Sequence, residues 1–138
     1  MAKLYFNYSS MNAGKSTMLL QANHNYTERG MNAQLYTSEL DTRFGNDEIT
    51  SRIGLKKKSN IFTTKTDIYS DILNKNNEVL VDCLLIDEAQ FLTKEQVAQL
   101  GMIVDKLDIP VLAFGIRTDF QGNLFEGSKH LLAWADNL

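Results

Sequence analysis

The sequence predicts an α/β fold in which a mostly parallel central sheet is flanked by helices. Two observations carry this prediction: short apolar runs alternate with segments whose apolar residues recur at helical spacing, and no repeat or linker interrupts them. The 138 residues, 43% apolar and 22% charged, have the length and composition of one globular domain. We therefore expect a single domain over residues 1–138, with right-handed crossovers between parallel strands.

The N-terminal part of the chain predicts two strands separated by a helix. Residues 3–8 form the first expected strand, and small residues at 9–14 lead into a helix that begins at Lys15. One face of this helix is apolar and carries Met18, Leu19, Ala22 and Tyr26. Gly30 fits the position just after the helix end, and residues 33–38 form the second expected strand.

The middle of the chain has a weaker pattern. Residues 39–60 are polar without clear periodicity, and they predict a long or partly ordered loop. A short strand at 61–63 and a helix from Asp67 to about residue 76 are expected next. Residues 80–86 are almost continuously apolar, as in a parallel strand that is covered on both faces.

A helix, a strand and a last helix complete the expected fold. Thr93 and Gln96 have the spacing of a capping box at a helix start. The inner face of that helix is expected to carry Val97, Leu100, Val104 and Leu107. Residues 109–114 predict another buried strand, 115–127 a loop and 128–136 the last helix.

The segment between the first strand and the first helix is a candidate phosphate-binding loop. Its sequence is Ser9-Ser10-Met11-Asn12-Ala13-Gly14-Lys15-Ser16-Thr17. Gly14 lets the backbone approach a phosphate, and the N–H groups that open the helix attract anions. In such a P-loop, Lys15 reaches the β- and γ-phosphates and the Ser16 hydroxyl ligates Mg²⁺. The strict pattern has glycine where this chain has Ser9, so a turn that merely contains Gly-Lys-Ser is the alternative.

Two acidic residues, Asp87 and Glu88, directly follow the apolar run at 80–86. Ligands of open α/β sheets bind outside the carboxyl ends of the strands, where the P-loop is also expected. The alternative is an ordinary turn, in which acidic residues are common. Together the two motifs predict ATP or GTP binding, with Asp87 holding Mg²⁺ through water and Glu88 accepting a proton from the attacking oxygen. An acidic residue directly after the aspartate resembles the RecA-like group of P-loop folds.

Composition and sequence pattern argue against several other classes of protein, although a local basic patch is not excluded. Lys and Arg total 14 against 17 Asp and Glu, which argues against a nucleic-acid binder held by phosphate contacts, and the run Lys56-Lys57-Lys58 is expected in a solvated loop. The single cysteine, Cys83, cannot form an internal disulfide or a cysteine-rich zinc site within these residues, and a buried thiol is expected. There is no apolar stretch of about 20 residues and no signal-peptide pattern, so we expect a cytoplasmic protein.

Five short motifs occur in order along the chain. They are Tyr8 with the P-loop segment 9–17, Asp41-Thr42-Arg43-Phe44, Ser51-Arg52-Ile53-Gly54, Asp87-Glu88-Ala89-Gln90-Phe91-Leu92 and Ile116-Arg117-Thr118-Asp119-Phe120. Over the whole chain, this set resembles the type II, cellular-type thymidine kinase family in its bacterial form. Bacterial members also replace the leading glycine, so Ser9 fits the family.

The resemblance implies transfer of the γ-phosphate of ATP, with Mg²⁺, to the 5′-hydroxyl of deoxythymidine, giving dTMP. It implies that Glu88 is the proton acceptor and that Lys15 and Arg43 steady phosphate charge, although a solvated loop arginine is the alternative for Arg43. The implied ATP contacts are Ser9, Ser10, Met11, Asn12, Ala13, Gly14, Lys15, Ser16, Thr17, Asp87, Glu88, Ala89 and Gln90. The implied walls around the thymine base, for which core packing is the alternative, are Met11, Phe91, Ile116, Phe120 and Phe125.

The family pattern also includes a C-terminal domain that this chain does not match. Family members continue with Cys/His residues that hold zinc, and with a lasso-like loop that reads the thymine edge. With Cys83 as the only cysteine, these 138 residues cannot form that zinc site. We therefore expect ATP to bind while thymidine phosphorylation is weak or absent. The resemblance further implies a homotetramer that acts in nucleotide salvage on small molecules, with no membrane or nucleic-acid partner.

The sequence is also compatible with two other classes of function. Asp87-Glu88-Ala89-Gln90 is also similar to a helicase Walker B motif, which would indicate a nucleic-acid-dependent RecA-like ATPase. The acidic balance and the absence of a second motor domain in this sequence argue against that class. The other alternative is a non-catalytic nucleotide-binding module, which wild-type behaviour of Glu88→Gln would favour.

Overall fold

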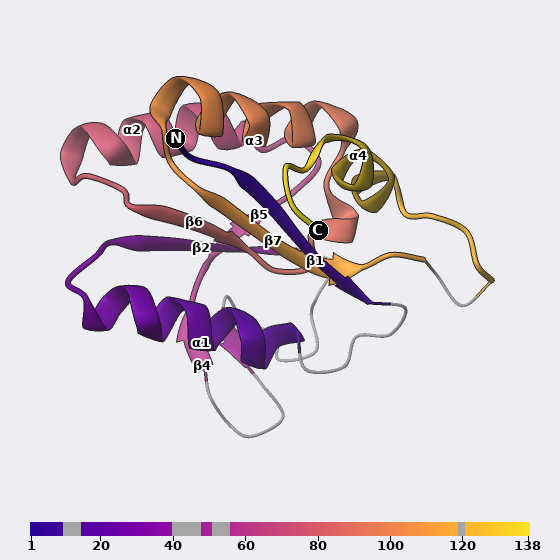
Figure 1. Ribbon diagram of the computed structural model, residues 1–138, viewed down its shortest axis with the longest axis horizontal. Helices are drawn as coiled ribbons and strands as arrows, with labels where there is room; N and C mark the ends of the chain where they lie inside the picture. Colours follow the sequence, from indigo (N-terminus) through magenta and orange to yellow (C-terminus); the bar gives the residue numbers. More distant parts are fainter. Residues whose placement is uncertain (10–14, 40–47, 51–55, 119–120) are drawn as a thin grey trace.

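Five parallel strands form the central sheet in the computed structural model of the protein (Figure 1). The structure describes residues 1–9, 15–39, 48–50, 56–118 and 121–138, and it describes only the backbone of residues 9, 15, 16, 48–50 and 56–58. In spatial order the strands are β1 (Leu4–Ser9), β7 (Val111–Ile116), β6 (Cys83–Ile86), β2 (Ala33–Ser38) and β5 (Asn60–Phe62). Every neighbouring pair in this sheet is parallel, which confirms the predicted fold class.

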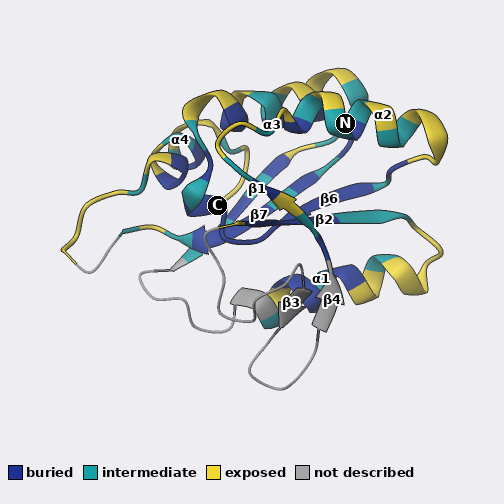
Figure 2. Cartoon of the chain, turned by 180° about the vertical axis from the view of Figure 1, so that it is seen from behind, coloured by how far each residue is buried: buried dark blue, intermediate teal, exposed yellow. Residues whose placement is uncertain are grey.

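Helices cover both faces of the sheet, as Figures 1 and 2 show from opposite sides. Helix α1 (Lys15–Glu28) lies on one face. The other face carries α2 (Ile68–Glu78), α3 (Lys94–Leu107) and α4 (Glu126–Trp134). The sheet is therefore the middle layer of three, and its central strands are buried (Figure 2).

Strand β6 shows how the two cores are built. Its side chains alternate between faces, so Cys83 and Leu85 pack beneath α1, while Leu84 and Ile86 join the larger cluster beneath the other three helices. All four residues are fully buried. The continuous apolar run therefore predicted its environment correctly, because a strand covered on both faces has no position for a polar side chain.

Two helix-end signals in the sequence are confirmed. The Thr93 hydroxyl accepts a hydrogen bond from the Gln96 N–H at 3.1 Å, and the Gln96 side chain accepts one from the Thr93 N–H at 3.0 Å. At the end of α1, Gly30 has a φ of 74°, and its N–H donates to the Thr27 carbonyl at 3.0 Å. These contacts satisfy backbone groups that the helices leave unpaired.

Several predicted boundaries are wrong by two or three residues. Strand β6 begins at Cys83, and the side chains of Val79 and Leu80 are 63% and 68% exposed in the connection from α2. Strand β7 begins after Pro110, which has no N–H to donate, and continues through Gly115 and Ile116, which were predicted as loop. Helix α4 begins at Glu126, two residues earlier than expected.

The prediction of a loop over residues 39–60 is also partly wrong. Within it, β3 (Glu48–Thr50) and β4 (Lys56–Lys58) form a separate antiparallel pair, so the lysine run belongs to a strand. Three-residue strands are too short to show periodicity. Lysine is also common on exposed edge strands, because its charge opposes pairing with another chain. In α1, Met18 is 46% exposed and Leu20 is buried in its place.

The C-terminal residues lie against the outer edge of β1 (Figure 1). Asn137 forms an isolated parallel bridge with Tyr5, and the Phe6 N–H donates to the Asn137 carbonyl at 2.9 Å. Among the described residues, no helix combines the length and the apolar character that crossing a bilayer requires.

Two glycines in helices are expected to respond in opposite ways to alanine. At Gly127 in α4, a Cβ would lie 2.4 Å from the Ala89 carbonyl oxygen, whereas at Gly101 in α3 it would meet no atom within 4 Å. We expect Gly127→Ala to lower the free energy of unfolding by about 1–3 kcal/mol through overpacking. Gly101→Ala should raise it by about 1 kcal/mol, because alanine loses less backbone entropy in a helix. Urea unfolding measures both, and equal effects would contradict the close packing of α4.

The thiol of Cys83 is expected to be inert in the folded protein. Burial raises the pKa of the thiol to about 12, and the side chain is fully buried. The reactive thiolate is therefore scarce at neutral pH and out of reach of reagents. Labelling with a chromogenic disulfide at pH 8 should proceed no faster than global unfolding, and it should become rapid in urea. Immediate labelling of the native protein would contradict this placement.

Candidate active site

The carboxyl ends of the parallel strands meet at one edge of the sheet. In the register of these strands, Ser9 pairs with Ile116, and Ile86 pairs with Ala113. The acidic pair that follows Ile86 therefore leaves the sheet near the end of β1, with β7 between the two strands. The structure thus brings the start of the P-loop segment and the acidic pair to the same edge.

Part of the predicted site lies outside the described residues. This part comprises Ser10, Met11, Asn12, Ala13, Gly14, Arg43 and Phe120. The backbone of Ser9 ends β1, and the backbone of Lys15 and Ser16 opens α1 at the same side of the sheet (Figure 1). Thr17 follows in the first turn of α1 and is half-buried. The N-terminus of α1 therefore faces the edge where Asp87 and Glu88 emerge.

Asp87 is fixed where β6 leaves the sheet. Its N–H donates to the Tyr36 carbonyl at 2.7 Å, which extends the ladder between β6 and β2 by one residue. Its carboxylate accepts a hydrogen bond from the Glu88 N–H at 3.0 Å, and the residue is only 2% exposed. A buried carboxylate must be hydrogen-bonded or bind a cation, so its position suits an Mg²⁺ ligand.

Glu88 has a left-handed backbone conformation, with φ 55° and ψ 41°. A residue with a side chain adopts this conformation at a cost of roughly 1–2 kcal/mol. The turn sends the chain from β6 into the short 3₁₀ helix η1 (Ala89–Phe91) and leaves Glu88 6% exposed. Strained positions of this kind are concentrated at functional sites, where the surrounding structure holds them.

The amide of Gln90 joins the acidic pair to β7. Its Nε2 donates to the Glu88 carboxylate, and its Oε1 accepts from the Ile116 N–H at 3.3 Å. Gln90 is 4% exposed. The side chain lies against Gly115, where a Cβ would come within 2.6 Å of the Gln90 Oε1. The glycine in β7 therefore gives the amide its space.

Three of the five predicted thymine-wall residues are described, and all three are partly buried at this edge. The rings of Phe91 and Phe125 meet edge to face, with centroids 5.7 Å apart. Ile116 ends β7, and its carbonyl accepts a hydrogen bond from the Ser128 hydroxyl at 2.5 Å. Phe91 also packs against the larger core cluster, so its contacts fit a ligand wall and core packing alike.

Tyr36 ties the acidic pair to α2. Its carbonyl accepts the Asp87 N–H, and its hydroxyl donates to the Asp71 carboxylate on α2. Burial and this hydrogen bond raise the pKa of Tyr36 far above its usual value, so the phenol stays protonated. The sequence pattern gave no reason to single out this residue, because its partners are distant along the chain.

Arg117 is a second residue for which the sequence predicted no role. Its guanidinium carbon lies 5.7 Å from the centroid of the Tyr8 ring, and Tyr8 immediately precedes Ser9. This distance is within the range of a cation–π interaction. An exposed positive charge therefore lies beside the end of β1. Arg117 belongs to the motif at 116–120, in which the resemblance implies roles only for Ile116 and Phe120.

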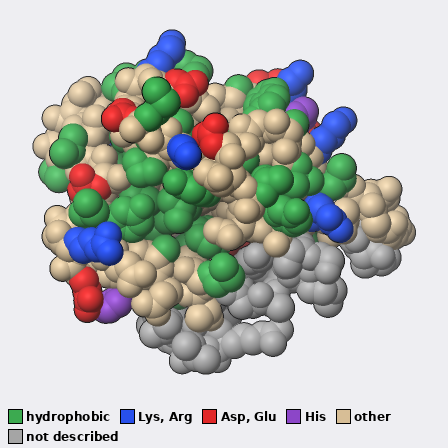
Figure 3. Space-filling view, in the orientation of Figure 1, with side chains coloured by type: hydrophobic (Ala, Val, Ile, Leu, Met, Phe, Trp, Pro, Cys, Tyr) green, Lys and Arg blue, Asp and Glu red, His purple; other side chains and the backbone are tan. Residues whose placement is uncertain are grey.

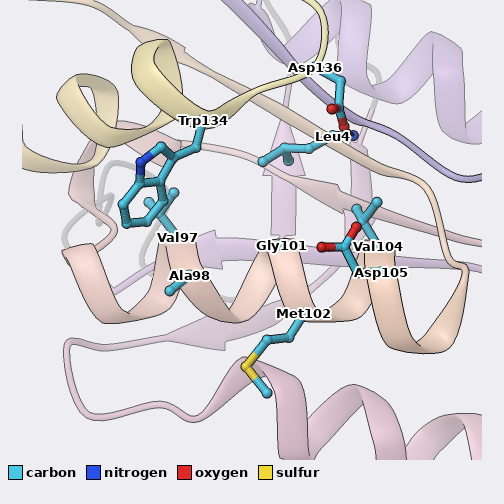
Figure 4. A pocket seen from close by; sticks show the side chains of 9 residues that line it. All are labelled: Leu4, Val97, Ala98, Gly101, Met102, Val104, Asp105, Trp134 and Asp136. Atoms are coloured by element: carbon cyan, nitrogen blue, oxygen red, sulfur yellow. Dashed lines mark hydrogen bonds between the residues drawn. The ribbon is translucent and has the colours of Figure 1, made fainter.

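Two hollows in the described part of the molecule lie away from this edge. One, about 330 Å³, lies between α3 and the C-terminal segment, and Trp134, Met102 and Asp105 help to line it (Figure 4). The other, about 390 Å³, lies near the amino ends of β1 and β7 and includes Tyr5 and Leu112. Hydrophobic side chains gather near the centre of the face that Figure 3 shows. Neither hollow contains a predicted site residue.

The described residues contain no group of three or more His, Cys, Asp and Glu side chains arranged to hold a metal ion. The acidic pair alone suits Mg²⁺, which in phosphoryl-transfer sites usually has one or two carboxylates, water and substrate phosphates as ligands. The edge therefore combines a helix N-terminus, which favours anions, with carboxylates that can hold a cation and accept a proton.

Known proteins match this chain over its full length. The family described as "Thymidine kinase" matches residues 2–138. A thymidine kinase of Rhodopirellula baltica is 59% identical over all 138 residues, which span 65% of that protein. Thymidine kinases of Pasteurella multocida and Salmonella typhimurium are 57% and 54% identical, and the chain spans 72% and 67% of them. The chain belongs to the thymidine kinase family.

Proposed function

We propose that this chain transfers the γ-phosphate of ATP to the 5′-hydroxyl of deoxythymidine, giving dTMP and ADP. The observation that carries the proposal is the shared edge. The buried pair Asp87–Glu88 emerges beside the end of β1 and the start of α1, in a chain of this family. Phosphoryl transfer requires mainly positioning and charge stabilisation, which such an edge can supply.

The proposed roles follow from the chemistry of each side chain. Glu88 accepts the proton of the attacking 5′-hydroxyl, and Lys15 and Arg43 stabilise negative charge on the transferred phosphate. The residues from Ser9 to Thr17, together with Asp87, Glu88 and Ala89, form the ATP side of the site, and Gln90 follows them in the chain. Asp87 and the Ser16 hydroxyl would hold Mg²⁺, which supplies charge neutralisation at the phosphates when it is bound.

The acceptor side is proposed to hold the thymine base between apolar side chains. The rings of Phe91 and Phe125 meet edge to face, and the half-buried Ile116 lies at the end of β7. Met11 and Phe120 complete the proposed wall. Aromatic rings favour the flat face of a base, which supports this location.

The chain spans 65% to 72% of the length of the three relatives above, so the activity of the whole protein is itself a proposal. We propose that a zinc-bound lasso domain of the full-length protein adds contacts to the thymine edge. We also propose a cytoplasmic homotetramer that acts in nucleotide salvage. All of these proposals rest on the family resemblance.

Separate titrations with the two substrates test the proposal. We expect calorimetry to show binding of ATP–Mg²⁺ to the 138-residue chain, because the ATP side of the site lies within it. Thymidine should bind weakly, and thymidine-dependent ADP production should be slow. ATP hydrolysis that is stimulated by single-stranded DNA and unaffected by thymidine would contradict the proposal and indicate a nucleic-acid-dependent ATPase.

Removal of the proposed base gives a sharper test. Glu88→Gln keeps the shape of the side chain but cannot accept a proton, so it should lower kcat for thymidine phosphorylation by about 10²–10⁴-fold. The Kd for ATP–Mg²⁺ should stay within about threefold, because the base acts on the acceptor. Glu78→Gln, an exposed change at the end of α2, serves as the matched control. Wild-type turnover by Glu88→Gln would indicate a different base.

A further inference from the structure

We propose that Gln90 is a positioning residue, whose side-chain amide orients the Glu88 carboxylate for proton transfer instead of contacting ATP. The inference rests on the proposed function, in which Glu88 is the base. The family resemblance includes Gln90 only in the segment that binds ATP. The contacts of its side chain point to a different task.

Both ends of the Gln90 amide have partners within the protein. Its Nε2 donates to the Glu88 Oε2, and its Oε1 accepts from the Ile116 N–H at 3.3 Å. These two partners fix the orientation of the amide, because a carboxylate needs a donor and a backbone N–H needs an acceptor. Only one N–H of the side-chain amide is left for any other contact, so the capacity of this side chain to bind a phosphate is small.

These two hydrogen bonds of the Gln90 amide form a clamp between the turn that carries Glu88 and the end of β7. Glu88 stands on the strained turn after β6, whereas Ile116 ends β7, the strand next to it. The Glu88 side chain has three rotatable bonds, and its backbone has a left-handed conformation that residues other than glycine rarely adopt. A link from the carboxylate to a sheet backbone therefore restricts both the rotamer and the turn. Small errors in the position of a catalytic group are costly, since about 1 Å of misplacement can lower the rate by about 10²-fold.

Gly115 makes this clamp possible. A Cβ at this position would lie 2.6 Å from the Gln90 Oε1, and 3.1 and 3.2 Å from the backbone nitrogens of Gln90 and Ala89. The glycine is therefore needed for close approach between β7 and η1. Gly115→Ala provides a way to displace the amide while leaving Gln90 itself in the sequence.

Kinetics separate a positioning role from an ATP contact. Gln90→Met removes the amide at nearly constant length, and Gln21→Met makes the same change on the exposed surface of α1. We expect Gln90→Met and Gly115→Ala to lower kcat for thymidine phosphorylation by about 10–100-fold. The Kd for ATP–Mg²⁺ should stay within about twofold of the wild-type value, and Gln21→Met should change neither quantity. A rise of tenfold or more in that Kd with kcat preserved would overturn the inference, as would an unchanged kcat in Gln90→Met.

A spectroscopic measurement tests the clamp without turnover. In protein labelled with ¹⁵N in glutamine side chains, Gln90→Met identifies the Gln90 amide signals by their disappearance. Those protons should exchange with solvent at least about tenfold more slowly than those of exposed Gln21, and they should shift in Glu88→Gln but not in Glu78→Gln. Exchange as fast as that of Gln21, with no response to Glu88→Gln, would overturn the clamp. Slow exchange in a chain that makes no thymidine-dependent ADP supports the clamp, and only the proposed function then fails.

Discussion

Burial of β6 on both faces is the constraint on which the rest of this site depends. Cys83 and Leu85 fill the core beneath α1, and Leu84 and Ile86 fill the core beneath the helices opposite. A slip of one residue along β2 or β7 would exchange these faces and would draw Asp87 into the apolar layer. The register therefore fixes where the charged residues begin. Because the neighbouring strands are parallel, it also fixes them beside the end of β1.

The same placement costs stability, and local contacts offset the cost. Asp87 and Glu88 are 2% and 6% exposed, and the backbone of Glu88 adds strain to the loss of hydration. Hydrogen bonds from the Glu88 N–H, from Gln90 and from the ladder to Tyr36 repay part of this free energy. Strained and desolvated carboxylates are rarely kept where stability alone is selected. Their presence at one strand end supports a functional role for this edge.

Local signals in the sequence predicted much of this fold. The strand over residues 33–38, the capping box at Thr93 and the acidic pair after the apolar run all depend on neighbours within a few residues, and the structure bears them out. Contacts between distant segments could not be predicted in this way. The bond between Gln90 and Ile116 joins residues 26 positions apart, and the fit of Gly115 against η1 leaves no periodic trace. The apolar residues Leu80 and Val81 misled the prediction of β6, which begins only at Cys83, since hydrophobicity alone does not mark where a strand begins.

The acidic pair is also coupled to helices that lie away from it. Tyr36 offers its carbonyl to Asp87 and its hydroxyl to Asp71, so a shift of α2 would act on the end of β6 through a single residue of β2. On the other side, Gly127 brings the start of α4 against the carbonyls of Ala89 and Leu92, at the turn that contains Gln90. The turn that carries Asp87 and Glu88 is thus held from β2, β7 and α4 at once. Rigid elements of this kind can maintain a strained glutamate that a loop alone could not hold.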